Sequence, residues 1–569
     1  MIRKPFVLRR GAGAIALAAL GLAIACGPTG PSSHQDFVRP SPATQYDLEP
    51  AGAGQPVPSA RDRTRLAALG YLEGGAGVAF SSESEPGWNT EQYDLVAEEG
   101  FLDVMRHPLS TFSIDVDTAS YSNLRRMLRD GLLPPGGAVR IEELVNYFSY
   151  DYPAASGDAP FSVSVETTAA PWAPAHRLVR IGLQGRVIEN RDLPPRNLTF
   201  LIDVSGSMRS SDKLSLVKYA MTALTRTLRA EDRVAIVVYA GASGLVLPPT
   251  SGVEGRRRIV EAIHRLEAGG ATSGAEGIRL AYEVARRSFD PAGINRVILA
   301  TDGDFNVGTS NRSDLIELIE KERESGVFLS VLGVGTGNLK DASMEQIADH
   351  GNGNYAYLDG MAEARRVLVE EAGGTLVTIA KDVKIQVEFN PQEISAYRLI
   401  GYENRRLAVT DFNDDTKDAG EIGAGHSVTA LYEAVPAGVA ASTGSVDTLR
   451  YQTPRETAAA HPGELLTLKL RYKEPQGDES RLLVEHVPHE VVPFDEASDD
   501  LRFAASVAAF GMLLRGSEHA GNASFAQIDS IARTTLADDP GGWRAEFVRL
   551  VARARELTTD AALPEIAHR

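Results

Sequence analysis

The chain has 569 residues, of which 43% are hydrophobic and 24% charged, and its formal net charge is -18 at pH 7. This length predicts several domains, and the composition is that of an ordinary globular protein. An acidic chain lacks the basic surface that a phosphate backbone requires, so we expect no nucleic-acid partner.

The N-terminus has the pattern of a secretory signal. Charged residues 1–10 precede a short apolar run, and the only cysteine, Cys26, follows that run. The run is too short for a membrane span. Residues 23–26 resemble a bacterial lipobox, which predicts a signal peptide over residues 1–26, a lipid anchor on Cys26 and, because Gly27 follows, an outer-membrane address. An ordinary signal peptide with an incidental cysteine is the alternative.

Residues 27–91 are rich in Pro, Gly, Ala and Ser and predict a disordered tether. Residues 92–196 predict a mixed region. A strand is expected over residues 111–117, then a helix capped by Ser120, and a second helix near residues 141–145 after the Pro-Gly break at 134–137. Residues 161–183 alternate and favour strands.

Residues 197–372 alternate apolar runs with amphipathic helical patterns. Strands are expected over residues 198–203, 234–240, 297–301 and 328–334, and their nearly continuous apolar character is typical of a parallel sheet buried on both faces. The alternation predicts a doubly wound, Rossmann-like α/β domain.

The remainder of the chain predicts a β-rich domain followed by a helical region. Alternating runs at residues 383–389, 428–432 and 465–472 favour strands within a β-rich domain over residues 373–495. Residues 496–569 should be largely helical, with helices near 500–516 and 541–556.

The first strand of the α/β block ends in a group of oxygen-bearing side chains. Asp203, Ser205 and Ser207 stand at alternate positions on the turn that leaves the strand. Ligands of open α/β sheets bind at the carboxyl ends of the strands. Hydroxyls and carboxylates suit Mg²⁺ or Mn²⁺ better than Zn²⁺. The alternative is that these residues only cap the following helix.

The pattern Asp203-x-Ser205-x-Ser207 resembles the metal-ion-dependent adhesion site of von Willebrand factor A (VWA) domains. Thr272, in a Gly-rich loop, and Asp302, after a later strand, fill the other two positions in the expected order. The resemblance implies that Ser205 and Ser207 bind the ion directly, that Thr272 does so when ligand is bound, and that Asp203 and Asp302 act through water. The last position is left for an acidic side chain of a partner.

The flanks resemble those of bacterial VWA-domain lipoproteins, over about residues 92–556. The matching stretches are residues 112–122, 140–148, 378–384, 397–404 and 418–426. The resemblance implies a lipid-anchored envelope protein, facing the periplasm or the cell surface, that binds a protein partner and has neither a catalytic residue nor a small-molecule substrate. One alternative is a structural scaffold in which the metal only stabilises loops. The other is a metal-dependent hydrolase with Glu276 or Asp304 as base.

Two further patterns mimic catalytic motifs. Asp115 and Asp117 follow a strand as in phosphatases, but Ala119 stands where that motif has Thr, so we expect a structural role. Ser215 and Lys218 match the Ser-x-x-Lys spacing of penicillin-binding enzymes, yet they fall inside a predicted helix of the α/β block and no Lys-Thr-Gly motif accompanies them.

Overall fold

The computed structural model describes residues 90–94, 97–114, 117–189, 191–270, 274–303, 312–371, 377–440, 461–537 and 539–561. The predicted signal peptide, Cys26, nearly all of the predicted tether and Thr272 lie outside these ranges. The described residues all belong to one compact unit that begins at Ser84. None of the helices in this described part has the length and apolar character needed to cross a membrane.

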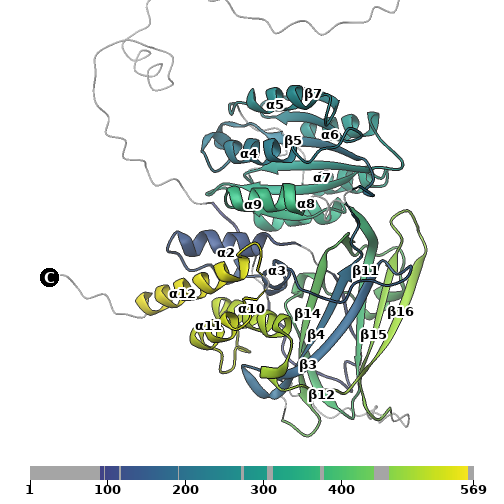
Figure 1. Cartoon of the computed structure of the whole chain (residues 1–569), viewed down its shortest axis with the longest axis vertical. Helices are drawn as coiled ribbons and strands as arrows, with labels where there is room; N and C mark the ends of the chain where they lie inside the picture. The colour runs from purple at the N-terminus through teal and green to yellow at the C-terminus, as the bar shows by residue number, and fades with distance from the viewer. Residues whose placement is uncertain are drawn as a thin grey trace, which may run out of the picture. The chain divides into compact units, whose positions relative to one another are not determined.

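The central block is a six-stranded α/β sheet (Figure 1). Its strands, in spatial order, are β10 (Tyr355–Leu358), β9 (Phe328–Val334), β8 (Ile294–Thr301), β5 (Arg196–Asp203), β6 (Arg233–Tyr239) and β7 (Ser243–Ser251). All neighbours are parallel except β6 and β7, which are antiparallel. Every residue of β5 is buried, as expected for a central strand covered on both faces.

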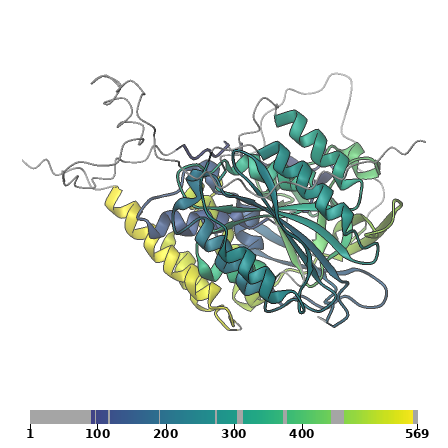
Figure 2. The ribbon, with the colours of Figure 1, turned by 90° about the horizontal axis from the view of Figure 1, so that it is seen from above.

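Helices cover both faces of this sheet. On one face α4 (Leu214–Leu224), α5 (Arg256–His264) and α9 (Met361–Arg365) share an apolar core with the strands. On the other face α6 (Gly274–Arg287), α7 (Arg312–Arg323) and α8 (Asp341–His350) form a second core. Figure 2 shows the strands running between the two groups of helices. The predicted doubly wound α/β domain is therefore confirmed.

The sequence patterns missed the two edge strands. In β7 two prolines interrupt the alternation, and most of the strand is exposed or half-buried because only β6 pairs with it. In β10 only four residues are extended. Neither strand has the length of apolar run that marks a central parallel strand.

The flanking segments build two antiparallel sheets together. One has the order β1 (Leu102–Asp103), β12 (Ile394–Ile400), β14 (Ser427–Pro436), β4 (Ala173–Gly185) and β3 (Phe161–Ala170). The other has the order β13 (Gly420–Gly423), β11 (Thr378–Phe389), β15 (Glu464–Lys473) and β16 (Ser480–Pro488), with β2 (Ser110–Ser113) also paired to β11. One apolar core contains side chains of both sheets, so they pack as a sandwich.

This sandwich crosses the boundaries expected from the sequence. Residues 92–196 and 373–495 were separate regions in the sequence analysis, but β4 pairs with β14 over eight residues and β2 pairs with β11. The α/β domain thus lies, along the chain, between two halves of one sandwich.

The remaining helices form a third layer, seen beside the sandwich in Figure 1. They are α2 (Ala119–Arg129), α3 (Ile141–Asn146), α10 (Asp499–Arg515), α11 (Phe525–Arg533) and α12 (Trp543–Ala561), and they share one apolar core. The predicted helices near residues 500–516 and 541–556 are confirmed as α10 and α12. The N-terminal and C-terminal segments again contribute to the same layer.

The predicted helix cap at Ser120 is wrong. The N-cap of α2 is Thr118, which makes no side-chain capping bond, and Ser120 lies inside the helix. Its hydroxyl donates to the carbonyl of Ala138 at 2.6 Å and accepts from the N–H of Arg140 at 2.9 Å. The serine therefore fixes the connection to α3, because these two long-range bonds satisfy the hydroxyl better than a local cap.

Candidate metal centre

Asp203 and Asp302 lie at the same edge of the α/β sheet. Asp203 is the last residue of β5, and Asp302 follows directly after β8. The two strands are parallel neighbours, with Ile202 opposite Ala300. Both carboxylates are buried, with relative exposures of 0% and 1%. The sheet therefore brings together two residues that are 99 positions apart in the sequence.

Hydrogen bonds hold the Asp203 carboxylate in one orientation. One oxygen accepts the backbone N–H of Ser205 at 2.8 Å. The other accepts the hydroxyls of Tyr239 at 3.2 Å and Thr301 at 3.3 Å. The sequence analysis did not identify these two hydroxyls. Tyr239 and Thr301 lie on the strands either side of β5, and only the pairing of those strands brings them to Asp203.

Ser205 and Ser207 present adjacent hydroxyls. Their Oγ atoms are 2.9 Å apart, on the turn from β5 into a single 3₁₀ turn, Gly206–Arg209. Ser205 occupies the N-cap position of that turn but makes no side-chain capping bond, and α4 also begins without one. The capping alternative therefore does not describe what these two hydroxyls do.

The loop that carries Thr272 begins beside the two serines. Thr272 itself lies outside the described residues. Just before it, the N–H of Gly269 donates to the carbonyl of Val204 at 2.7 Å, and the carbonyl of Gly270 accepts the N–H of Gly206 at 3.1 Å. Because α6 starts at Gly274, the chain between these anchors is short.

A lysine that the sequence analysis missed also belongs to this cluster. Lys213, immediately before α4, places its Nζ 2.8 Å from a carboxylate oxygen of Asp302. The side chain of Lys213 is only 8% exposed. A lysine at the start of a helix usually projects into solvent, so nothing local in the sequence distinguishes it.

The electrostatics of the cluster favour a cation. Burial raises the pKa of Asp203 above its usual value, the nearby Asp302 carboxylate raises it further, and the hydrogen bonds from Ser205 lower it. The cluster thus contains two buried carboxylates and one lysine, which pairs with Asp302, so its net charge is negative. In the part of the chain that the structure describes, no three His, Cys, Asp or Glu side chains form a metal-binding group. Hydroxyl and carboxylate oxygens are nevertheless a donor set that fits a hard divalent ion such as Mg²⁺.

The loops around these residues face solvent. Residues 209–212, Gly241, Ala242 and Gly270 are exposed, and Ser207 is half-buried. The described residues of these loops are therefore open to solvent next to the cluster.

Asp117 and Lys218, from the two motifs that mimic catalytic sites, make structural contacts, whereas Asp115 lies outside the described residues. Asp117 accepts the N–H of Tyr355 at 2.7 Å and pairs with Arg405 at 3.1 Å, so it ties the flanking segment to β10. Lys218 donates to the carbonyls of His264 and Leu266, both at 2.9 Å, which braces α4 against the end of α5. Of the two candidate bases of a hydrolase, Glu276 is exposed on the first turn of α6, and Asp304 lies outside the described residues.

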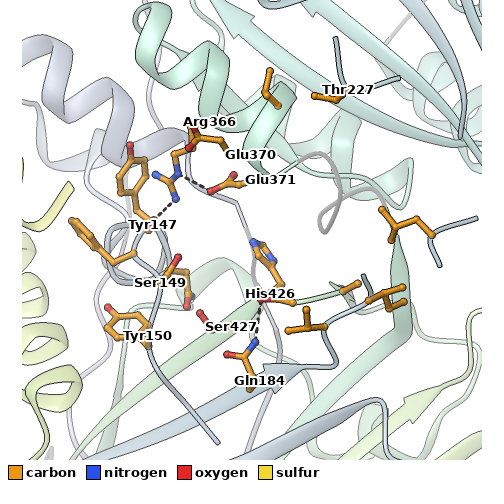
Figure 3. A pocket seen from close by; sticks show the side chains of 18 of the residues that line it. Tyr147, Ser149, Tyr150, Gln184, Thr227, Arg366, Glu370, Glu371, His426 and Ser427 are labelled. Carbon is orange, nitrogen blue, oxygen red and sulfur yellow. Dashed lines mark hydrogen bonds and ion pairs between the residues drawn. The ribbon is translucent and has the colours of Figure 1, made fainter. Parts of the chain in front are cut away.

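A cavity of about 510 Å³ lies at the opposite end of β5 (Figure 3). Arg196, the first residue of that strand, lines it, whereas Asp203 is the last, roughly 23 Å away at about 3.3 Å per residue. In the cavity wall Arg366 donates to Glu371 at 2.6 Å and to the carbonyl of Tyr147. The cavity is therefore separate from the candidate metal centre.

Comparison with known proteins identifies the family. Family models match residues 87–180 (von Willebrand factor), residues 198–304 (von Willebrand factor type A domain) and residues 374–557 (uncharacterized protein YfbK, C-terminal). The chain is 45% identical over 478 residues to the uncharacterized protein YfbK of Escherichia coli strain K12, and the match covers 82% of each chain. The chain belongs to the YfbK family of VWA proteins.

Other similar proteins match smaller parts of the chain or match it at lower identity. The chain is 33% identical over 199 residues to the magnesium-chelatase 60 kDa subunit of Cereibacter sphaeroides, covering 32% of this chain and 34% of that one. Among solved structures, a von Willebrand factor type A protein from Catenulispora acidiphila is 16% identical and covers 67% of this chain and 88% of its own, with a TM-score of 0.38.

Proposed function

We propose that this protein binds a protein partner through a divalent cation, Mg²⁺ or Mn²⁺, held by Asp203, Ser205, Ser207, Thr272 and Asp302. An acidic side chain of the partner completes the coordination of the ion. One observation supports the proposal above all. The buried carboxylates of Asp203 and Asp302 and the adjacent hydroxyls of Ser205 and Ser207 lie at the same edge of the sheet, beside exposed loops. The protein acts as a binding module and not as an enzyme.

The choice of an acidic partner follows from the charges. The ion brings two positive charges, and among the described residues the cluster holds the carboxylates of Asp203 and Asp302 and the ammonium group of Lys213. The loaded site therefore keeps positive charge, which attracts a carboxylate where the exposed loops admit one.

The same proposal places the protein in the bacterial cell envelope. Cys26, after the apolar run that ends at Ala25, would carry the lipid, and the Pro- and Gly-rich residues 27–91 would let the folded unit reach partners at a distance from the membrane. Labelling with a radioactive or alkyne fatty acid tests the anchor: wild-type protein takes up label, and Cys26→Ser does not. Uptake by Cys26→Ser would exclude Cys26 as the anchor.

Calorimetric titration with Mg²⁺ and Mn²⁺ tests the metal site. The wild type should bind one ion, and Asp203→Ala should lose at least about tenfold in affinity, since a nearby carboxylate contributes on the order of 1.4 kcal/mol or more. Asp232→Asn is the matched control, because Asp232 is also 0% exposed but pairs with Arg196 at the far end of β5. Equal metal binding by wild type and Asp203→Ala would refute the site.

Capture of envelope proteins in Mg²⁺ and in EDTA then tests the partner. Binding that disappears in EDTA and in Asp203→Ala, at temperatures where both remain folded, supports a metal bridge. If binding merely follows the folded fraction, the metal has only a structural role. Hydrogen bonds from Ser205, Tyr239 and Thr301 already hold the Asp203 carboxylate without an ion. They weigh against the scaffold alternative, in which the metal only stabilises the loops.

A further inference from the structure

Lys213 is built into the candidate metal centre rather than resting on the surface. Its Nζ lies 2.8 Å from Asp302, and the two side chains are 8% and 0% exposed. Moving an ammonium group out of water is costly unless a partner compensates for the lost hydration. The Asp302 carboxylate supplies that compensation, so the pair is a fixed feature of the site.

A glycine next to Lys213 leaves the space that its side chain occupies. Gly335, directly after β9, has a φ of +74°, and a Cβ at this position would lie 2.3 Å from the Cγ and Cε atoms of Lys213. Two features therefore favour glycine at position 335: its backbone φ is positive, and a Cβ there would clash with the Lys213 side chain. The aliphatic stem of the lysine runs across the Gly335 backbone to reach Asp302.

We propose that Lys213, paired with Asp302, acts as an internal cation that sets the charge of the metal site, weakening its hold on the divalent ion and strengthening its attraction for a partner carboxylate. This inference rests on the proposed metal-dependent function. Without the ion, Asp203, Asp302 and Lys213 together carry one negative charge. With the ion they carry one positive charge, which an incoming carboxylate neutralises.

The site would behave differently without the lysine. The two aspartates would then carry two negative charges and hold the ion more tightly, but the loaded site would be neutral and would attract a carboxylate less. The two effects have opposite signs. A lysine that only stabilises the fold would not produce this pattern, because a destabilised site loses affinity for both ligands.

The test compares Lys213→Met with the wild type by calorimetry at pH 7.5. Mn²⁺ is titrated first, and acetate and a short Glu-containing peptide are then titrated into the Mn²⁺-saturated protein. One unit charge within several ångströms changes affinity by about tenfold. Lys213→Met should therefore bind Mn²⁺ about tenfold more tightly and the carboxylate probes about tenfold more weakly.

Three further variants make the test specific. Lys213→Arg keeps the charge and should remain within about threefold of the wild type for both ligands. Lys473→Met removes another largely buried lysine, which pairs with Asp382 at 2.6 Å in the β-sandwich, and should change neither affinity. If Lys213→Met does not fold, Lys213→Gln removes the same charge and must shift the two affinities in the same opposite directions.

The outcomes separate this inference from the function on which it rests. If the wild type binds Mn²⁺ but the neutral variants bind it no more tightly, or bind carboxylate equally well, the role of Lys213 is overturned and the metal site stands. If only the neutral variants bind Mn²⁺, Lys213 blocks the ion: its charge effect is supported and the proposed function of the wild type is overturned. If no variant binds, both are overturned.

Discussion

Asp232 anchors the amino end of the strand whose other end carries Asp203. It is fully buried, and its carboxylate accepts the backbone N–H of Arg196 at 2.9 Å and the guanidinium of Arg196 at 2.7 and 3.1 Å. The N–H and guanidinium of Arg229 donate to it at 2.7 and 3.1 Å. Burial opposes ionisation, but these donors outweigh it and lower the pKa of Asp232 from 3.8 to about 2.

The lowered pKa sets the sign and size of a pH effect. A carboxylate whose pKa is lower in the folded state stabilises the fold above the unfolded-state pKa and loses this contribution as the pH falls through the folded-state value. For Asp232 that window runs from about pH 4 to about pH 2. The difference between 3.8 and about 2 corresponds to roughly 2.4 kcal/mol of unfolding free energy at pH 7, of which roughly 1.3 kcal/mol should remain at pH 3.

Urea unfolding of the wild type and Asp232→Asn at pH 7, 4 and 3 measures this contribution. The variant should be less stable at pH 7 by at least about 2 kcal/mol, and the gap should narrow by roughly 1 kcal/mol at pH 3. Glu261→Gln is the control, because Glu261 forms an exposed pair with Arg257 and should change stability by less than about 1 kcal/mol. A gap between wild type and Asp232→Asn that does not change with pH would refute the argument.

Two further predictions concern the contacts of the flanking layers. Arg125 of α2 pairs with three carboxylates, those of Asp359 at 2.5 Å, Glu363 at 2.7 Å and Glu546 at 3.0 Å. Because Arg125→Met leaves these carboxylates without this cation, it should lower the unfolding free energy by about 3–5 kcal/mol. A loss below about 1 kcal/mol in chemical denaturation would contradict this. Burial, with a smaller contribution from Arg366, lowers the pKa of His426 from 6.5 to about 4. Because this base is harder to protonate when folded, the protein loses stability as the pH falls from 6.5 towards 4. Between pH 7 and pH 5, His426→Gln should lose roughly 1–2 kcal/mol less than the wild type in urea unfolding, and equal losses would show that His426 does not titrate in this way.

The α/β domain is the part of the fold that the sequence predicts best. Its central strands are buried on both faces, so the requirement for apolar residues is continuous along each strand and visible without knowing the neighbours. The positions of Asp203, Ser205 and Ser207 follow directly, since the end of such a strand marks the sheet edge where ligands bind. The structure also brings Asp302 to that edge, as the order of the motif predicts.

The arrangement of the flanks could not be predicted from local patterns. Alternation shows that β4 and β14 are strands, but not that they pair, because the pairing joins segments separated by the whole α/β domain. Ser120 illustrates the same limit: its position favours a cap, and only the approach of Ala138 and Arg140 gives its hydroxyl other partners.

The sequence by itself determined the family, the doubly wound domain and the order of the candidate metal ligands, because these depend on short patterns with a fixed period or spacing. Only the tertiary structure decided that the two flanks form one sandwich and one helical layer, and that Lys213 belongs to the candidate metal centre. Lys213 is buried because Gly335 leaves room for its stem and Asp302 compensates for its charge, and both residues directly follow strands far along the chain. The burial and charge balance of such a group depend on the assembled fold, which no local pattern encodes.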